Sequence, residues 1–251
     1  MKLHLISNNN HKIMKSIIHD TKERIYYSLM LAPASTSGFN VCSASGDCEK
    51  FCVSFTGKGG IPTVQQARIR KTLLFMNKRD LFFELLENDI CKLAEFAYQQ
   101  KKQLVIRLNT FSDLAFELIK PELFKTFHDV IFIDYTKRKD RILRYIRNLF
   151  PKNYFLAYSH NEKSEDFSIY ALQNNVNVSF VVRRPKQIPL RIEGFPVTDA
   201  DYSDSWIIDN KGTIGILKAK GKLISSDSPF VLNSFIEIDA QLSYEMLSYA
   251  I

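Results

Sequence analysis

Three of the four cysteines in the chain lie close together near the N-terminus. Cys42, Cys48 and Cys52 follow a Cys-x5-Cys-x3-Cys spacing, and the glycine-rich stretch TGKGG comes directly behind them at 56–60. Thiolates are the soft ligands that zinc and iron–sulfur clusters take. Disulfides rarely persist inside cells, and the chain carries no sign of export. Three clustered cysteines in an intracellular protein therefore favour a metal centre over a disulfide.

Three interpretations of the clustered cysteines stay open: an iron–sulfur cluster, a zinc ion, or no bound group. Three cysteines on a four-iron cluster leave one iron free for substrate, another residue or water. A structural zinc site usually has four ligands in close pairs, and the second pair is missing here. Cysteines also serve as small buried hydrophobes, as expected for Cys91 in its helical pattern. Because the segment around Cys42–Cys52 is polar and rich in glycine, we predict an iron–sulfur cluster, with zinc as the alternative.

The elements that must position these cysteines alternate between strand and helix. Apolar runs typical of strands occupy 25–31, 103–108, 130–134, 153–158 and 176–182. Stretches with helical periodicity lie between them, most clearly at 79–100 and 139–150. This alternation predicts an α/β fold built as a partial parallel (β/α) barrel.

The rest of the chain fits the same single unit. We expect one α/β domain over 1–251, with a cysteine- and glycine-rich cluster loop at 33–60. Two strand-like runs around an Asn-Lys-Gly turn predict a C-terminal β-hairpin at 205–223. No linker or low-complexity segment divides the chain.

Polar residues recur where the predicted strands end. Parallel sheets bind ligands at the carboxyl ends of their strands, so these residues are candidates for a common site, although helix capping explains each one taken alone. The candidates for catalysis are Asp113, Asp134, Asp199 and Asp201. The candidates for cofactor binding, besides the three cysteines, are Gly57, Gly59, Gly60, Asn109 and Ser159.

The charge balance permits a polyanionic partner. The chain has 34 Lys and Arg against 27 Asp and Glu, a formal net charge of +7. Such a surplus suits nucleic acid or a phosphorylated ligand, although solvated helix faces also carry charge. The candidate anion contacts are Arg68, Arg70 and Lys71 behind the glycines, Arg107, and Lys137, Arg141 and Arg144 in the basic run at 137–152. The last three share a helix face opposite the apolar stripe, where they could follow a nucleic-acid backbone.

No apolar run is long enough to cross a membrane, and the N-terminus lacks a signal peptide. We therefore expect no membrane partner and a cytoplasmic location.

The order of several motifs is similar to that of a known family. LAPASTSGFNVC, GKGG, ARIRKTLLF, IRLNTFSD, FHDVIFIDYTK and GFPVTDADYSD occur in this order between about 29 and 232. In this the chain resembles the gene product eighty-eight type family of phage proteins. The resemblance implies a phage or mobile-element protein, located in the host cytoplasm, with a [4Fe–4S] cluster on Cys42, Cys48 and Cys52.

The chain is also distantly similar to radical S-adenosylmethionine enzymes. These enzymes hold a cluster with three cysteines at the rim of a partial α/β barrel, so the resemblance implies a radical-SAM-like barrel. It also implies S-adenosylmethionine as a second cofactor. The family spacing is Cys-x3-Cys-x2-Cys, and the spacing here departs from it.

These observations lead to one expectation and two alternatives. We expect an iron–sulfur protein of phage type, and whether it is an enzyme is left undecided by the sequence. The first alternative is a nucleic-acid-binding protein in which the cluster, or a zinc ion, only braces the fold. The second is a zinc-stabilised module that binds a host protein.

Overall fold

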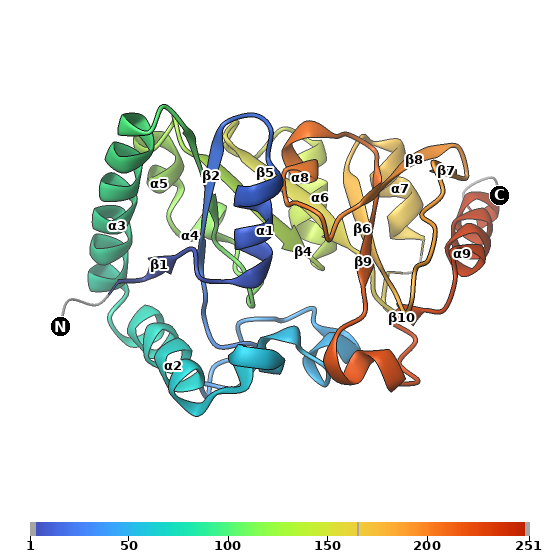
Figure 1. Ribbon diagram of the computed structural model, residues 1–251, viewed down its shortest axis with the longest axis horizontal. Helices are drawn as coiled ribbons and strands as arrows, with labels where there is room; N and C mark the ends of the chain where they lie inside the picture. Colours follow the sequence, from blue (N-terminus) through green and yellow to red (C-terminus); the bar gives the residue numbers. More distant parts are fainter. Residues whose placement is uncertain (1–3, 165, 249–251) are drawn as a thin grey trace.

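The strands expected from the apolar runs form the middle of one sheet (Figure 1). The computed structural model describes residues 4–164 and 166–248. The central strands are β2 (Arg24–Leu29), β3 (Gln103–Arg107), β4 (Ile131–Thr136), β5 (Tyr154–Ser159) and β6 (Asn177–Val182). Each pairs in parallel with the next, as expected when helices or long crossovers connect successive strands.

Shorter strands extend the sheet on both sides. They are β1 (Ile6–Ser7), β7 (Arg191–Ile192), β8 (Phe195–Asp199), β9 (Ile214–Lys218) and β10 (Val231–Leu232). Strands β9 and β8 continue the parallel order beyond β6, and β1 and β7 are the antiparallel end strands. Strand β10 pairs with the end of β6. Within the described residues the fold is thus a ten-stranded, mostly parallel α/β sheet whose two end strands do not pair with each other.

The prediction of a β-hairpin at 205–223 is wrong. The apolar run after Ser205 forms the single helical turn α8 (Trp206–Asp209), and only the second run is a strand, β9. The Asn-Lys-Gly segment therefore joins a helix to a strand that lies between β6 and β8 and is parallel to both. The Trp206 ring packs where a side chain on Gly215 would lie, which fixes α8 on the face of the sheet. An antiparallel pair does occur near the C-terminal part, but it is β7 with β8.

Helices cover both faces of the sheet (Figure 1). Helix α1 (His11–His19) and α8 pack on one face against alternate strand residues such as Tyr26, Val105 and Ile133. The other face buries their neighbours Ile25, Leu104 and Phe132 under the remaining helices. Those helices are α2 (Pro62–Asn77), α3 (Arg79–Gln99), α4 (Phe116–Ile119), α5 (Pro121–Thr126), α6 (Lys139–Ile146), α7 (Phe167–Gln173) and α9 (Phe235–Ser248).

The helix boundaries follow local signals. Pro62 occupies the first turn of α2, where its missing N–H costs nothing. Of the apolar positions predicted on one face of α3, Phe82, Leu86, Ile90 and Ala97 are buried and Leu85 and Leu93 are partly buried. Cys91, expected in the core, is exposed. Helix α6 ends at Ile146, earlier than the predicted 150, and the turn behind it places Asn148 at a φ of 56°.

The predicted cluster loop runs along the carboxyl ends of the parallel strands. In Figure 1 it is the light blue and cyan segment below β2, β4 and β6. It contains three short 3₁₀ helices, η1 (Gly46–Glu49), η2 (Val53–Phe55) and η3 (Gly57–Gly60). A fourth 3₁₀ helix, η4 (Gly221–Ser225), lies beside the loop. The two are in close contact, since the Thr56 side chain fills the space that a side chain on Gly221 would need. The fold therefore brings the cysteines to the edge where parallel sheets bind ligands.

Among residues 4–164 and 166–248, no helix has the length and apolarity needed to cross a bilayer.

Candidate metal centre at the carboxyl edge of the sheet

The three clustered cysteines share one half-buried loop. Cys42 precedes η1, Cys48 lies within it, and Cys52 precedes η2. Burial raises the pKa of the Cys42 thiol to about 12, and the nearby Cys52 and Cys48 add to the shift. Burial also raises the pKa of Cys52, again with a contribution from Cys48. Without a bound cation, the Cys42 and Cys52 thiols therefore stay protonated near neutral pH.

Hydrogen-bond donors nevertheless point at two of the sulfurs. The backbone N–H of Ala34 donates to Cys42 Sγ at 3.4 Å, and the Cys42 thiol lies 3.3 Å from the carbonyl oxygen of Phe111. Ser54 lies beside Cys52 and acts to lower the pKa of its thiol. Donors of this kind stabilise the thiolate form, which is the form that binds metals.

The first half of the loop is tied to two strand ends. The Asp113 N–H, beyond β3, donates to the Val41 carbonyl at 2.8 Å. The Asn161 side chain, beyond β5, donates to the Ala44 carbonyl at 3.2 Å. Cys42 is thus held between contacts to the β3 and β5 ends of the sheet.

A second pair of contacts fixes η1. The Asp47 N–H donates to Glu162 Oε1 at 2.8 Å, and Ser228 Oγ donates to Asp47 Oδ2 at 2.9 Å. Gly46 has a φ of 54°, and an added Cβ there would overlap the Glu162 carboxylate. Cys48 packs beside this anchor against the small apolar cluster that contains Leu223 and Phe230.

The predicted glycines shape the loop itself. A Cβ on Gly59 would lie 2.3 Å from the Ser54 carbonyl oxygen, and one on Gly60 would lie 2.8 Å from that of Phe55. Gly57 has a φ of 52°, a conformation that favours glycine. The glycines let η2 and η3 fold tightly against each other beside Cys52.

Arg68, from α2, contacts this part of the loop directly. Its Nη1 donates to the carbonyl oxygens of Ser54 at 2.7 Å and of Gly59 at 3.4 Å. The guanidinium lies 4.4 Å from the ring centre of Phe111, and its positive charge helps to lower the pKa of Cys52. Arg68 is 7% exposed, so this charge acts in a poorly solvated region.

The other two predicted cations behind the glycines lie elsewhere. Arg70 is exposed, and Lys71 Nζ donates to the Leu5 carbonyl at 2.7 Å, away from the loop. Burial lowers the pKa of Lys71 to about 8.

Asp134 and Asn109 form a buried brace below the loop. Asp134 is fully buried and accepts hydrogen bonds from Asn109 N at 2.6 Å, from Asn109 Nδ2 at 2.8 Å and from the Tyr154 hydroxyl. Burial raises the pKa of this carboxyl group to about 6. The Asn109 side-chain oxygen accepts from Ser112 and from the Leu114 N–H, both at 2.8 Å. These candidates hold the β3 and β4 ends in register.

Arg141 belongs to the same interior, so the expectation that it lies on an exposed basic face is wrong. Its guanidinium is fully buried and binds both Glu117 oxygens, at 2.9 and 2.8 Å, and Asp113 at 2.9 Å. Asp113 also accepts from Thr136 Oγ1 at 2.7 Å and from the Lys137 N–H at 2.8 Å. The Arg141 guanidinium is therefore paired with internal carboxylates and is too deeply buried to contact a nucleic-acid backbone.

Lys137 and Ser159, a predicted anion contact and a predicted cofactor-binding residue, lie together just beyond β4 and at the end of β5. Lys137 Nζ donates to Ser159 Oγ at 2.7 Å and lies 4.6 Å from the ring centre of Phe230. Beside them, burial lowers the pKa of His160 to about 3, so this imidazole is neutral.

A separate charged cluster lies on the α1 face of the sheet. Asp204, fully buried, lies 3.4 Å from Lys12 Nζ and 3.3 Å from Arg107 Nη1, and it accepts from the Tyr135 hydroxyl at 2.9 Å. Burial opposes ionisation of Asp204, but Lys12 and Arg107 hold its pKa below the usual range. Sequence reasoning missed Lys12 because an N-terminal helix gives no signal for a partner so far away in the chain.

Asp199 and Asp201 flank this cluster. Burial of Asp201 opposes ionisation, but Lys220, 2.6 Å away, holds its pKa below the usual range. Asp199 is partly exposed and lies 3.7 Å from Lys218 Nζ.

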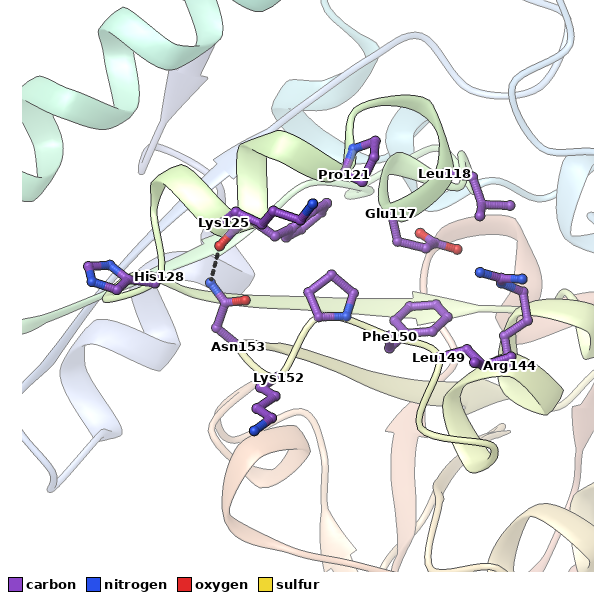
Figure 2. Close-up of a pocket in the computed structure, with 12 residues that line it drawn as sticks. Glu117, Leu118, Pro121, Lys125, His128, Arg144, Leu149, Phe150, Lys152 and Asn153 are labelled. Atoms are coloured by element: carbon purple, nitrogen blue, oxygen red, sulfur yellow. Dashed lines mark hydrogen bonds between the residues drawn. The ribbon is translucent and has the colours of Figure 1, made fainter.

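Two cavities lie at opposite ends of the strands. The larger, of about 620 Å³, is the groove in Figure 2, between α5 and the segment 149–153. His128 and Asn153 line it just before β4 and β5, so it lies at the amino ends of these strands, and Arg144 is the one predicted site residue in its wall. The second, of about 580 Å³, adjoins the cysteine loop at Ser43 and Ala44.

The candidate ligands do not form a converged set of metal ligands in the described part of the chain. In the described part of the chain, no three His, Cys, Asp or Glu side chains converge as a group that could hold a metal ion. A zinc ion with bonds of about 2.3 Å needs its sulfurs within roughly 4 Å of each other.

The comparisons with known proteins concern nearly the whole chain. The family model for gene product 88 matches residues 4–233, which include the cysteine loop and every strand of the sheet. No curated protein and no solved structure matches the chain. The chain belongs to the gene product 88 family of phage proteins.

Proposed function

We propose that this chain is an iron–sulfur protein that holds a [4Fe–4S] cluster through Cys42, Cys48 and Cys52. The carrying observation is that all three thiols lie in one loop at the carboxyl edge of the sheet, close enough that Cys48 helps to raise the pKa of both Cys42 and Cys52. The loop is anchored on both sides of this group, by Asp113 and Asn161 before Cys48 and by Arg68 after Cys52.

The donor set fits such a cluster in its chemistry. Three thiolates together with inorganic sulfide make an anionic group, and the buried Arg68 offsets negative charge beside Cys52. The Ala34 N–H points at Cys42 Sγ, as expected for a sulfur that carries charge. When bound, the cluster would supply an open iron as a Lewis acid or an electron donor.

A zinc ion fits the same loop less well. The described side chains do not gather tightly enough around a single point, and no histidine completes the set. The cysteine sulfurs that bind a four-iron cluster lie farther apart than those that bind a single ion. This wider spacing suits three thiols that influence one another's charge but do not surround a single point.

The finer form of the fold is part of the proposal. We take the parallel run from β2 to β6, extended by β9 and β8, as a partial barrel of the radical-SAM-like kind. Support comes from the position of the cysteine loop at the carboxyl ends and from Ser159 and Lys137 on the same edge. The strand-end cations and acids would then bind and orient a second ligand, S-adenosylmethionine being one candidate.

The test is iron and acid-labile sulfide per chain, with a visible spectrum, on protein purified without oxygen. We expect about four of each, and we expect Cys42→Ser, Cys48→Ser and Cys52→Ser each to lose most of both. Cys91→Ser is the matched control, because Cys91 is exposed on α3 and should keep the full content. Wild-type protein without iron, or loss of iron in Cys91→Ser alone, overturns the proposal.

A second candidate function is nucleic-acid binding with the cluster as a brace. The burial of Arg141 removes the centre of the predicted basic helix face, but the second cavity still gathers basic side chains beside the loop. This candidate therefore depends on that cavity and not on the surface of α6.

A further inference from the structure

The larger cavity, the groove of Figure 2, lies at the edge of the sheet opposite the cysteine loop. Its floor is apolar and well supported. Phe124 and Phe150 both pack against the buried ring of Tyr154, with ring centres 4.8 and 5.6 Å away. Pro121 and Pro151 add apolar surface from the two walls. A ligand that enters this groove therefore meets a preformed apolar floor.

Two leucines that line the same groove are open to solvent. Leu118 is 50% exposed and Leu149 is 54% exposed. Single exposed leucines are common on protein surfaces, but two that line one cavity form an apolar surface that a bound side chain would cover. The middle of the groove thus favours an apolar side chain over a hydrated ion.

The groove also carries cations that are not paired with acidic residues. Lys125, Arg144 and Lys152 form no ion pair within residues 4–164 and 166–248. The one acidic residue of the lining is Glu117, and Arg141 binds both of its oxygens from behind the groove. Even if Glu117 is set against Arg144, the two lysines remain, so the lining has a net positive charge.

Two further carboxylates are close to the lining in sequence but do not belong to it. Glu122, in the first turn of α5, is exposed and forms no ion pair in the part of the chain that the structure describes. Asp129 is also exposed and lies 3.5 Å from the imidazole of His128. Water and salt screen such exposed charges, so the lysines of the groove stay available to a ligand.

Two polar groups of the groove lack a partner among the described residues. Arg144 Nε is buried and has no acceptor there. The side-chain nitrogen of Asn153 donates to three carbonyl oxygens, those of Phe124, Phe127 and Val130, but its side-chain oxygen accepts no hydrogen bond in 4–164 or 166–248. Buried donors are nearly always hydrogen-bonded in proteins, so Arg144 requires an acceptor such as a carboxylate. The Asn153 oxygen requires a donor, which a peptide N–H supplies and a phosphate backbone does not.

We propose that this groove binds an acidic, extended segment of a partner protein. An apolar side chain of the segment would pack on the floor. Its carboxylates would bind Arg144 at one end of the groove and Lys125 at the other, where Asn153 also lies (Figure 2). The inference does not depend on the proposed cluster, because the cysteine loop lies at the opposite ends of the strands.

The first test measures fluorescence anisotropy of a short labelled peptide that carries one phenylalanine between two pairs of glutamates. The groove variant is Lys125→Gln with Arg144→Gln. The matched control is Arg70→Gln with Lys222→Gln, which removes the same charge from exposed positions on α2 and η4. We expect the groove variant to bind the peptide about tenfold more weakly and the control to bind it as the wild type does. Urea unfolding should be unchanged in both variants, because the replaced side chains form no ion pair within the described residues.

A second pair of variants tests the apolar part of the groove. Leu149→Glu places a negative charge where the phenylalanine of the peptide would pack, so it should weaken binding by at least about tenfold. Leu190→Glu is the matched control, since Leu190 is exposed outside the groove and should leave binding unchanged. A peptide with alanine in place of phenylalanine should bind wild-type protein more weakly.

Several results would overturn the inference. Failure to bind the peptide would do so, as would equal losses in the two double variants, which indicate diffuse surface charge. Equal binding of the alanine peptide would show that the floor takes no apolar side chain. Single-stranded DNA that displaces the peptide and is itself lost in the groove variant would assign the groove to nucleic acid. Iron measured on the same samples separates this inference from the cluster, because iron-free protein that binds the peptide contradicts only the cluster.

Discussion

At the scale of single residues, Asp134 shows how burial sets the chemistry beneath the cysteine loop. The carboxyl group is fully buried, and its pKa is raised to about 6 although three hydrogen bonds reach it. A neutral Asp134 suits the interior better than a charged one, since charge is costly away from water.

This pKa predicts how stability depends on pH. Because the folded pKa lies above that of the unfolded chain, the folded state binds more protons between about pH 4 and 6. The contribution of Asp134 to stability is therefore full below pH 4 and is lost as the pH rises through 6, about 3 kcal/mol in all. Asp201 and Asp204, whose pKa values are lowered, contribute slopes of the opposite sign in wild type and variant alike, so the effect of Asp134 is the difference between the slopes of urea stability against pH in wild type and in Asp134→Asn. A slope unchanged by the substitution would assign it to another group.

At the scale of elements, one charged side chain ties α6 to two other parts of the fold, in addition to the packing of its apolar face. Arg141 joins this helix to Glu117 of α4 and to Asp113 in the loop after β3. Arg141→Met leaves two carboxylates without their partner, so we expect the free energy of unfolding to fall by about 3–5 kcal/mol. Arg147→Met, at the exposed end of the same helix, should change it little. Urea unfolding measures both, and a loss of DNA affinity in Arg141→Met without loss of stability would contradict the buried position.

The same element shows where sequence reasoning ends. The five central strands were predictable because each is an apolar run buried on both faces. The exposed face assigned to Arg141 followed from helical periodicity, but periodicity cannot reveal Glu117, 24 residues earlier in the chain. The run at Trp206 was apolar enough for a strand, but it forms a helical turn whose Trp206 ring packs over Gly215. Local pattern thus predicts the elements, whereas partners distant in sequence decide which charges face outward.

At the scale of the whole molecule, the cysteine loop lies on the sheet without belonging to its main core. The large apolar cluster contains none of the three cysteines, and Cys48 packs only against the small cluster around Leu223 and Phe230. The sheet should therefore stay folded when the cysteine loop loses its structure.

This separation gives a test between a functional cluster and a brace. After removal of the metal by a chelator, we expect the far-ultraviolet circular dichroism and the urea midpoint to change little. Hydrogen exchange should become faster only around 42–60. Unfolding of the entire chain on chelation would instead favour the structural role of the second candidate function.

The anchors of the loop also carry a consequence for the order of events during synthesis. The side chains that hold Ala44 and Asp47 come 115 to 181 residues later in the chain, at Asn161, Glu162 and Ser228. At about 5–20 residues per second, a ribosome needs roughly ten to forty seconds to reach the last of them. Throughout that interval the three thiols are exposed to solvent, because the residues that anchor their loop have not yet been synthesised. The proposed cluster would therefore be assembled only on the finished chain, and the cysteines would be open to oxidation before that point.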